Sequence, residues 1–324
     1  MPSRADHIQQ AVDRLRAGEL VAFPTETVYG LGANALDDGA VAKVYEVKGR
    51  PAANPLIVHV ADESMAKVVA AHWPDDASKL ALAFWPGPLS IIVPKAPCIP
   101  DRVTAGSPNV AVRCPDHPLS LELLRRLGVP LVGPSANPSG RISPTTAAHV
   151  RESFPGLMVL DGGVCRGGIE STVVSLVGEP RILRPGLITR EQIQSVLRRP
   201  VAIVERSAGA ALESPGQMEA HYAPRAKAIR FHASHLDRVL ALGGRVVVLS
   251  HSGLRVGPPH AMIAMPVQAG AYASALYAAM RRADETHPDV IAIEEVTPIG
   301  TEYDRGIWGA VADRVRRATV PVPT

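Results

Sequence analysis

A run of hydroxyl, carboxylate and phenol groups occupies residues 24–32, with the sequence PTETVYGLG. It follows the apolar run from Leu20 to Phe23, which predicts a short buried strand. Loops at strand ends often carry binding and catalytic residues. Two glycines, Gly30 and Gly32, would let the backbone approach a ligand closely. An ordinary polar turn explains these residues about equally well.

Lys48 and Arg50 flank a glycine directly before a proline, and Arg113 supplies another cation elsewhere in the chain. Such groups suit a polyphosphate, because nucleotidyl transfer depends on positioning and charge stabilisation. Cations that cap a helix C-terminus are the simpler explanation for the tripeptide taken alone. His59 stands in the strand-like run LIVHV, where a lone histidine is more often a core residue than a catalyst.

Small hydroxyl and amide groups, including Ser135 and Asn137, fill the segment GPSANPSG. The pair Ser143 and Pro144 predicts the N-cap and first residue of a helix over 144–152. The free N–H groups of such a helix start can bind phosphate or carboxylate. Turn and cap chemistry alone explains Ser143 fully and Asn137 partly.

Two further segments carry charged or aromatic groups beside apolar runs. Ser171 follows a glutamate just ahead of a predicted strand, and Arg184 ends the next strand. A hairpin edge with solvated charges is the alternative. His221 and Tyr222 are an aromatic pair in an otherwise small and polar stretch, and they predict either a hinge or a hook that folds back over a site.

The elements that must position these groups alternate between strand and helix without a strict order. Strands are predicted over 20–23, 56–60, 90–93, 110–112, 131–132 and 173–177, and helices after Ser3, before Gly49, over 63–72, 118–127 and 144–152, and after the capping box of Thr189 and Gln192. Residues 1–200 therefore predict one α/β domain with a twisted mixed sheet. Residues 201–225 predict a linker.

A second alternation follows the linker. Residues 226–324 predict a compact α/β domain with strands over 229–231, 246–249 and 290–293 and helices over 234–242, 271–284 and 306–318. This domain has no GxGxxG after a strand, so dinucleotide binding is not indicated.

Composition narrows the class of protein. The chain of 324 residues has a formal net charge of only +3, so its charge does not force it to bind a polyanion. Its three cysteines have no CxxC spacing, which favours a reducing cytoplasm over a disulfide or zinc scaffold. No apolar run is long enough to cross a bilayer, and no P-loop, HExxH or GxSxG is present. The residues alone thus predict an α/β protein with a mildly basic cleft for a small anion.

Taken in order, the segments resemble the YrdC-type threonylcarbamoyl-AMP synthase family. The resemblance rests on PTETVYGLG, KGRP with NPLIVHV, WPGPLS, VAVRCP, GPSANPSG, ISPT, ESTVV and ILRPG within residues 1–200. The tetrapeptide HYAP and the trailing α/β unit resemble the long, two-domain form of this family.

The resemblance implies a YrdC-like catalytic domain with a basic cavity and a smaller Rossmann-like C-terminal domain. It also implies a nucleotidyltransferase that makes L-threonylcarbamoyl-AMP and pyrophosphate from L-threonine, bicarbonate or CO2, and ATP with Mg²⁺. The product would serve the t6A modification of adenosine 37 in tRNAs that read codons starting with A. A downstream threonylcarbamoyl-transferase machinery would receive it, tRNA would touch the enzyme weakly if at all, and no membrane would be involved.

By position, the resemblance assigns Lys48 and Arg50 to a catalytic, phosphate-binding pair. The other residues that it places at the nucleotide are Asn54, Asn109, Ser135, Asn137, Ser143, Arg184 and Tyr222. The residues that it places at the threonine are Thr27, His59, Arg113 and Ser171. It implies no protein ligand to a metal.

Two other functions compete with this assignment. A related enzyme that makes another carbamoyl-adenylate, as in hydrogenase maturation, would carry cysteine pairs, which this sequence lacks. A non-enzymatic RNA-binding module would use the basic cavity and bind RNA in a salt-sensitive way. The aromatic content of 4% offers few stacking surfaces for that role.

Overall fold

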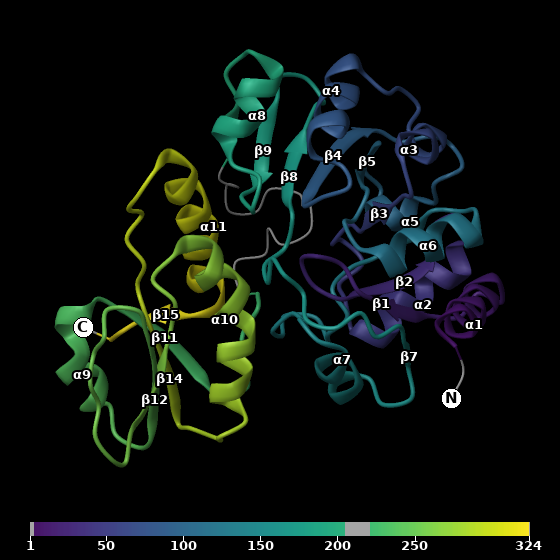
Figure 1. Cartoon of the computed structure of the whole chain (residues 1–324). Coiled ribbons are helices and arrows are strands. Elements are labelled where there is room, and N and C mark those ends of the chain that lie inside the picture. The colour runs from purple at the N-terminus through teal and green to yellow at the C-terminus, as the bar shows by residue number, and fades with distance from the viewer. Residues whose placement is uncertain (1–2, 205–220, 324) are drawn as a thin grey trace.

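The computed structural model describes residues 3–204 and 221–323 of the chain. Two sheets with their helices lie side by side (Figure 1). We call β1–β10 with α1–α8 the N-terminal unit, and β11–β15 with α9–α11 the C-terminal unit. The predicted linker, 201–225, lies mostly outside the described residues, and its bounds remain a prediction.

The N-terminal unit is built on a mixed sheet. Among the described residues its ten strands run in the order β10-β9-β8-β4-β5-β3-β6-β2-β1-β7. The strands are β1 Val21–Phe23, β2 Gly30–Asn34, β3 Ile57–His59, β4 Leu89–Pro94, β5 Asn109–Arg113, β6 Leu131–Val132, β7 Met158–Val159, β8 Thr172–Ser175, β9 Arg181–Arg184 and β10 Ala202–Ile203. The sheet thus extends three residues beyond the predicted domain end at 200.

The helices of this unit cover the sheet and connect its strands. They are α1 Arg4–Arg16, α2 Asp38–Lys48, α3 Glu63–Val69, α4 Asp75–Phe84, α5 Asp101–Thr104, α6 Pro118–Leu127, α7 Ala147–Ser153 and α8 Arg190–Leu197. The predicted capping signals form: Ser3 caps α1, Thr189 makes a capping box with Gln192 at α8, and Gly49 ends α2 in the left-handed conformation. The predicted mixed α/β fold is confirmed.

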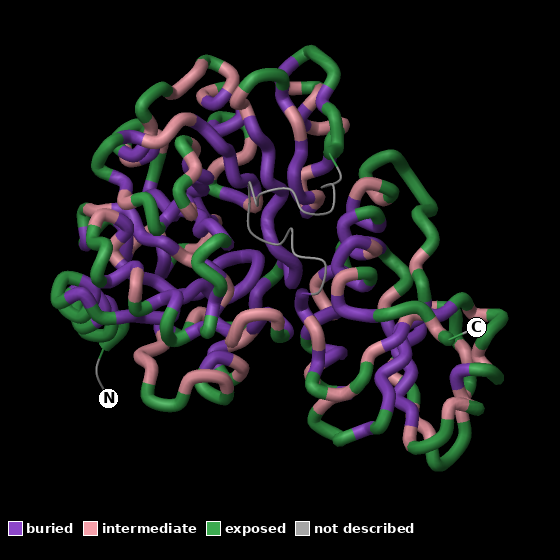
Figure 2. Tube along the Cα trace, turned by 180° about the vertical axis from the view of Figure 1, so that it is seen from behind, coloured by how far each residue is buried: buried purple, intermediate pink, exposed green. Residues whose placement is uncertain are grey.

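The C-terminal unit has a parallel sheet. Every pairing that the structure describes in it is parallel, in the order β13-β12-β14-β11-β15. Its elements are β11 Lys227–Phe231, a 3-10 turn at Ala233–His235, α9 Leu236–Leu240, β12 Val246–Ser250, β13 Ala261–Ala264, α10 Ala269–Asp284, β14 Val290–Glu294, α11 Glu302–Ala318 and β15 Val320–Pro321. The parallel order matches the expected Rossmann-like character. The strands of both sheets are largely buried (Figure 2).

One apolar cluster crosses from one unit to the other. Tyr272, Leu276 and Tyr277 of α10 pack in the same buried cluster as Ile142 and Ile169 of the N-terminal unit. Burial of apolar surface is the main favourable term in such contacts. The two units are therefore joined by a shared core, and α10 and α11 are the helices that contact the N-terminal unit.

Gly30 and Gly32 were expected in a loop where a ligand approaches, and this expectation is wrong. Both lie in β2, paired with β1. A Cβ on Gly32 would stand 2.9 Å from the Val21 carbonyl oxygen and 3.0 Å from the Phe23 ring. The glycines thus provide room for Phe23, not for a ligand.

Gly32→Ala is expected to lower the free energy of unfolding by roughly 1–3 kcal/mol, because β1 and its aromatic ring must shift. Gly309→Ala in α11 is the matched control, since a Cβ there meets nothing within 4 Å and alanine is the better helix former. Urea unfolding of both variants would measure the difference. Equal stabilities would contradict this explanation of Gly32.

Candidate functional site

Lys48 joins two loops of the N-terminal unit. It is the last residue of α2, and the left-handed Gly49 turns the chain away immediately after it. Its Nζ donates to the carbonyl oxygens of Ser135 and Asn137, each at 2.5 Å. The structure therefore brings together three of the residues predicted at the nucleotide.

Arg50 turns inward from the loop that follows α2. Its Nε donates to the Asn54 carbonyl at 3.1 Å, and its Nη2 donates to the Pro55 carbonyl at 2.9 Å. The parallel register of β3 and β5 pairs residue 57 with 111. Asn109 is the first residue of β5 and pairs with Pro94 of β4. Arg50 and Asn54, both predicted at the nucleotide, are therefore in direct contact through the Asn54 carbonyl.

The two cations are buried, and no described carboxylate neutralises them. Lys48 is 3% exposed and Arg50 is 9% exposed. No carboxylate within the described ranges comes within ion-pair distance of either one. Burial, and then the neighbouring Arg50, hold the pKa of Lys48 well below its usual value. Burial also lowers the pKa of Arg50 to about 10. A site with this excess of positive charge favours an anionic ligand.

A second group lies across the opposite ends of β3 and β5. His59 is paired with Arg113 in the sheet. The Arg113 guanidinium makes an ion pair with Glu26, with Nη2 and Oε1 2.7 Å apart, and its Nε donates to the Gly87 carbonyl. The contact with Glu26 is close but lacks hydrogen-bond angles. Arg113 thus already has a partner, which the sequence reasoning did not assign.

Thr27 and Ser171 complete the residues predicted at the threonine. The Thr27 hydroxyl lies 2.9 Å from that of Thr25. The Ser171 hydroxyl lies 2.8 Å from that of Ser90 and accepts from Arg184 Nη2 at 3.1 Å. All four hydroxyl residues are buried.

Arg184, predicted at the nucleotide, is bonded to Ser171, predicted at the threonine. Its Nε donates to the Ser171 carbonyl at 3.0 Å. Burial lowers the pKa of Arg184; Tyr222 opposes this shift and the charge of Arg314 adds to it. Its position at the end of β9, beside the start of β8, brings the guanidinium to Ser171.

Ser143 does not cap a helix, so that prediction is wrong. The helix begins at Ala147 with Thr146 as its N-cap. The Ser143 hydroxyl instead donates to Glu170 Oε1 at 2.7 Å. A hydrogen bond to a charged acceptor is stronger than one to a neutral group, which favours this contact over a helix cap.

His221 and Tyr222 are buried near the predicted site. Tyr222 is 1% exposed. The pKa of His221 falls to about 3, first by burial, with the charges of Arg50, Lys48 and Arg184 acting in the same direction. The next residue, Ala223, donates its N–H to the Gly140 carbonyl, which ties the pair to the loop that follows Asn137. The pair thus lies within electrostatic reach of the cations, and its role as a hinge or a hook stays a prediction.

His59 is a neutral histidine in the folded protein. Burial, and then the charge of Arg113, lower its pKa to about 3. In the unfolded chain the same group titrates near 6.5. Between these values the unfolded state binds a proton that the folded state does not. Stability from this group is complete above pH 6.5 and is lost as the pH falls toward 3.

Between pH 6 and pH 4, the unfolding free energy of the His59→Asn variant is accordingly expected to fall less steeply than that of the wild type. The two slopes should differ by about 1 kcal/mol per pH unit. Urea unfolding at each pH measures this slope, with His235→Asn, at an exposed position, as control. A slope equal to that of the wild type would show that His59 does not carry the effect.

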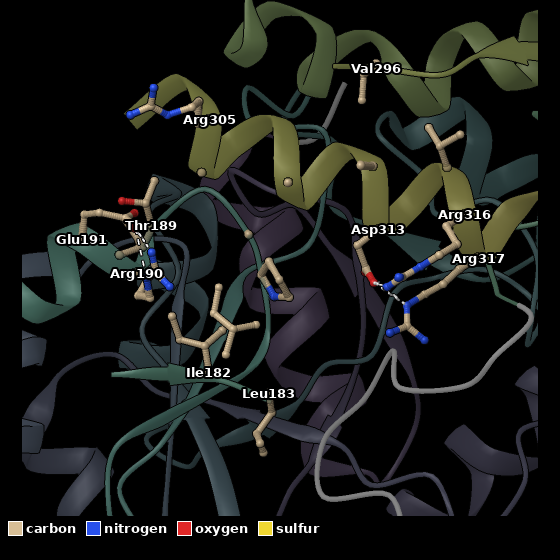
Figure 3. Close-up of a pocket in the computed structure, with 18 of the residues that line it drawn as sticks. Ile182, Leu183, Thr189, Arg190, Glu191, Val296, Arg305, Asp313, Arg316 and Arg317 are labelled. Carbon is tan, nitrogen blue, oxygen red and sulfur yellow. Dashed lines mark hydrogen bonds and ion pairs between the residues drawn. The ribbon is translucent and has the colours of Figure 1, made fainter. Parts of the chain in front are cut away.

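A cleft of about 970 Å³ opens between the two units, beside the buried groups. Figure 3 shows α11 with Arg305, Asp313 and Arg316 on one side and Thr189 and Glu191 on the other. Its charges are largely paired with one another: Arg316 and Arg317 with Asp313, Arg190 with Glu191, and Arg230 with Glu295. Its lining includes none of the predicted site residues, although Leu183 and Pro185 flank Arg184.

Among residues 3–204 and 221–323, no group of three or more His, Cys, Asp or Glu side chains could hold a metal ion. In the same parts of the chain, no helix is both long and apolar enough to cross a bilayer.

Sequence reasoning missed the acidic and C-terminal contacts of the site. Glu26 stands inside a segment already singled out, but nothing in its spacing points to Arg113. Glu170 likewise precedes a predicted residue without showing its partners, Tyr277 and Arg314. Pairs this far apart in sequence leave no local pattern.

Two family models match the chain almost end to end. The one described as "Telomere recombination" matches residues 13–186, and the one described as "Threonylcarbamoyl-AMP synthase, C-terminal domain" matches residues 188–320. The chain is 39% identical to the threonylcarbamoyl-AMP synthase of Pyrococcus abyssi over 96% of its own length and 94% of that relative. It is 42% identical to that of Bacillus subtilis over 96% and 92% of the two chains.

A solved structure shows the same architecture. The crystal structure of P. abyssi Sua5 complexed with L-threonine superposes with a TM-score of 0.88 at 38% identity, covering 100% of this chain and 98% of that one. A shorter relative, a putative threonylcarbamoyl-AMP synthase of Mycobacterium tuberculosis, is 40% identical over 60% of this chain and 90% of its own.

Proposed function

The chain belongs to the threonylcarbamoyl-AMP synthase family, and we propose that it forms L-threonylcarbamoyl-AMP and pyrophosphate from L-threonine, bicarbonate and ATP. The observation that carries this proposal is the pair of buried cations, Lys48 and Arg50, without a carboxylate partner among the described residues. Family membership supplies the substrates, and the geometry supplies a place for the polyphosphate. This assignment makes the protein a nucleotidyltransferase.

The reaction forms two bonds, one after the other. The free amine of threonine attacks carbon dioxide and loses a proton, which gives a carbamate. A carbamate oxygen then attacks the α-phosphorus of ATP, and pyrophosphate leaves. Negative charge grows on that leaving group, where Lys48 and Arg50 would stabilise it. Both cations are held by backbone carbonyls, so they need little reorganisation when the charge develops.

The threonine would lie at the other group of residues. Arg113 suits its carboxylate, because a guanidinium binds a carboxylate through two parallel hydrogen bonds. Glu26, already beside Arg113, would face the ammonium or hydroxyl of the same substrate. Ser171, bonded to Arg184, would lie between the threonine and the nucleotide. We expect Tyr222 to exclude water, which protects the unstable carbamate.

Mg²⁺ would enter with the nucleotide. Such ions are usually held by substrate phosphates and only one or two carboxylates. The phosphates of ATP would therefore supply most of its ligands. Bound to ATP, it would add to the charge stabilisation of the pyrophosphate.

The labile product implies a partner. We expect a separate threonylcarbamoyl transferase to receive the adenylate for tRNA modification in the cytoplasm, with at most weak contact between tRNA and this enzyme.

Pyrophosphate release from ATP tests the function directly. It should require both threonine and bicarbonate, and mass spectrometry should identify threonylcarbamoyl-AMP. Release with another amine and not with threonine would preserve the chemistry and overturn the substrate. RNA affinity without nucleotide turnover would support the binding-module alternative.

A further inference from the structure

Arg314 of α11 is a fully buried guanidinium whose hydrogen bonds cross from the C-terminal unit to the N-terminal unit. Its Nε donates to Glu170 Oε2 at 2.8 Å. Its Nη2 donates to the carbonyl oxygens of Glu170 at 3.4 Å and Pro185 at 3.0 Å. Its Nη1 pairs with the adjacent Asp313 at 2.9 Å. One side chain therefore fastens two loops of the N-terminal unit to α11.

Each of these loops carries a residue of the proposed site. Glu170 directly precedes Ser171, and Pro185 directly follows Arg184, which donates to the Ser171 carbonyl. The loops are closely packed, since a Cβ on Gly186 would stand only 2.3 Å from the Thr172 nitrogen. A shift of either loop would therefore move the site residue beside it.

The carboxylate of Glu170 has a second donor from the C-terminal unit. The Tyr277 hydroxyl lies 3.0 Å from Oε2 and 3.2 Å from Oε1, while Ser143 donates to Oε1. Burial alone would raise the pKa of Glu170, but the charges of Arg314 and Arg184 outweigh it and lower the pKa. The carboxylate thus stays charged and keeps the Ser143 hydroxyl fixed.

The same two C-terminal residues also pack against Tyr222. The rings of Tyr222 and Tyr277 stack with centroids 5.6 Å apart and an angle of 30°. The Arg314 Cζ lies 5.6 Å from the centre of the Tyr222 ring. Arg314 and Tyr277 are therefore in contact with both Glu170 and Tyr222.

We propose that Arg314 is a positioning residue of the reaction, which through Glu170 and Pro185 holds Ser171, Ser143 and Arg184 in place and also packs on the ring of Tyr222. This inference rests on the proposed function. It gives the C-terminal unit a role in the reaction without placing any of its atoms on a substrate.

Arg314→Lys tests the role, because lysine keeps the charge but cannot donate to Glu170 and Pro185 in the same planar arrangement. We expect kcat/KM for threonine-dependent pyrophosphate release to fall roughly 10–100-fold, the effect of a displacement of about 1 Å. Arg305→Lys, at an exposed position of the same helix, is the matched control and should remain within about 2-fold. Assays are run well below the melting temperature and normalised to folded enzyme.

A double variant separates positioning from mere stability. In a Glu170→Gln background, Arg314→Lys should cost less than about 3-fold, because the shared carboxylate has already been lost. A purely structural role would lower the melting temperature of Arg314→Lys but leave kcat/KM per folded molecule unchanged, and that result would overturn the proposal. Equal losses in both backgrounds would also overturn it.

Tyr277→Phe provides a test if Arg314→Lys does not fold. It removes the hydroxyl that faces Glu170 and keeps the ring on Tyr222, so we expect a loss of roughly 3–10-fold. Wild-type activity in this variant would then overturn the proposal. If the wild type itself releases no pyrophosphate with threonine, the proposed function fails. Positioning is then judged by calorimetric ATP affinity, which must weaken in Arg314→Lys and not in Arg305→Lys.

Discussion

Replacing Lys48 or Arg50 by alanine is expected to lower threonine-dependent pyrophosphate release by at least about 1000-fold, because each cation would face the charge that develops on the leaving group. Both side chains are buried against carbonyl oxygens, with no carboxylate beside them in the described parts of the chain. An uncompensated buried charge is unfavourable in the free enzyme. The melting temperature of each variant should therefore stay the same or rise while activity disappears.

Steady-state release assays and circular dichroism melting measure the two quantities. Lys67→Ala, an exposed lysine of α3 paired with Glu63, is the control and should be nearly neutral. Near-normal release by both Lys48→Ala and Arg50→Ala would show that the polyphosphate binds elsewhere.

The local structure that carries Lys48 and Arg50 could be predicted from the sequence. Apolar residues at helical spacing and a terminal glycine predict where α2 ends. The position of this helix end is enough to place Lys48 and Arg50 on either side of the same turn. The capping box at Thr189 and the strands around β3 and β5 are equally local features. Signals of this kind depend only on residues within one or two helical turns. A single sequence therefore contains all the information needed to recognise them.

The rest depends on contacts between distant segments. β2 looks like a loop because its glycines are explained only by the Phe23 ring across the hairpin. Ser143 has the ideal type for a helix cap, yet a carboxylate 27 residues later takes its hydroxyl. The pairing of Arg314 with Glu170 spans 144 residues. No periodicity or spacing within either segment reports such a partner.

Arg113→Met is expected to raise the KM for threonine by about 100-fold while the KM for ATP changes little, since it removes the guanidinium proposed to bind the substrate carboxylate. The same change leaves Glu26 buried without its cation. Loss of one partner of a buried ion pair destabilises a protein by roughly 3–5 kcal/mol. Poor stability could therefore imitate poor binding.

The double variant Arg113→Met with Glu26→Gln resolves this ambiguity. A neutral amide no longer needs the guanidinium, so the unfolding free energy should largely recover, whereas the KM for threonine should stay high. Initial-rate kinetics and urea unfolding on the single and double variants give both values. A double variant with the wild-type KM for threonine would exclude Arg113 as the carboxylate ligand.

The core shared by the two units has an evolutionary consequence. Relatives about as long as the N-terminal unit exist, yet that unit could not simply be excised from this chain. Val28, Ile142 and Ile169 would lose their apolar cover, and Glu170 would lose its guanidinium. Several replacements would have to arise together before a shortened gene gave a folded enzyme. Each residue of the N-terminal unit that adapts to the C-terminal unit thus makes a later loss of the C-terminal unit from the lineage harder.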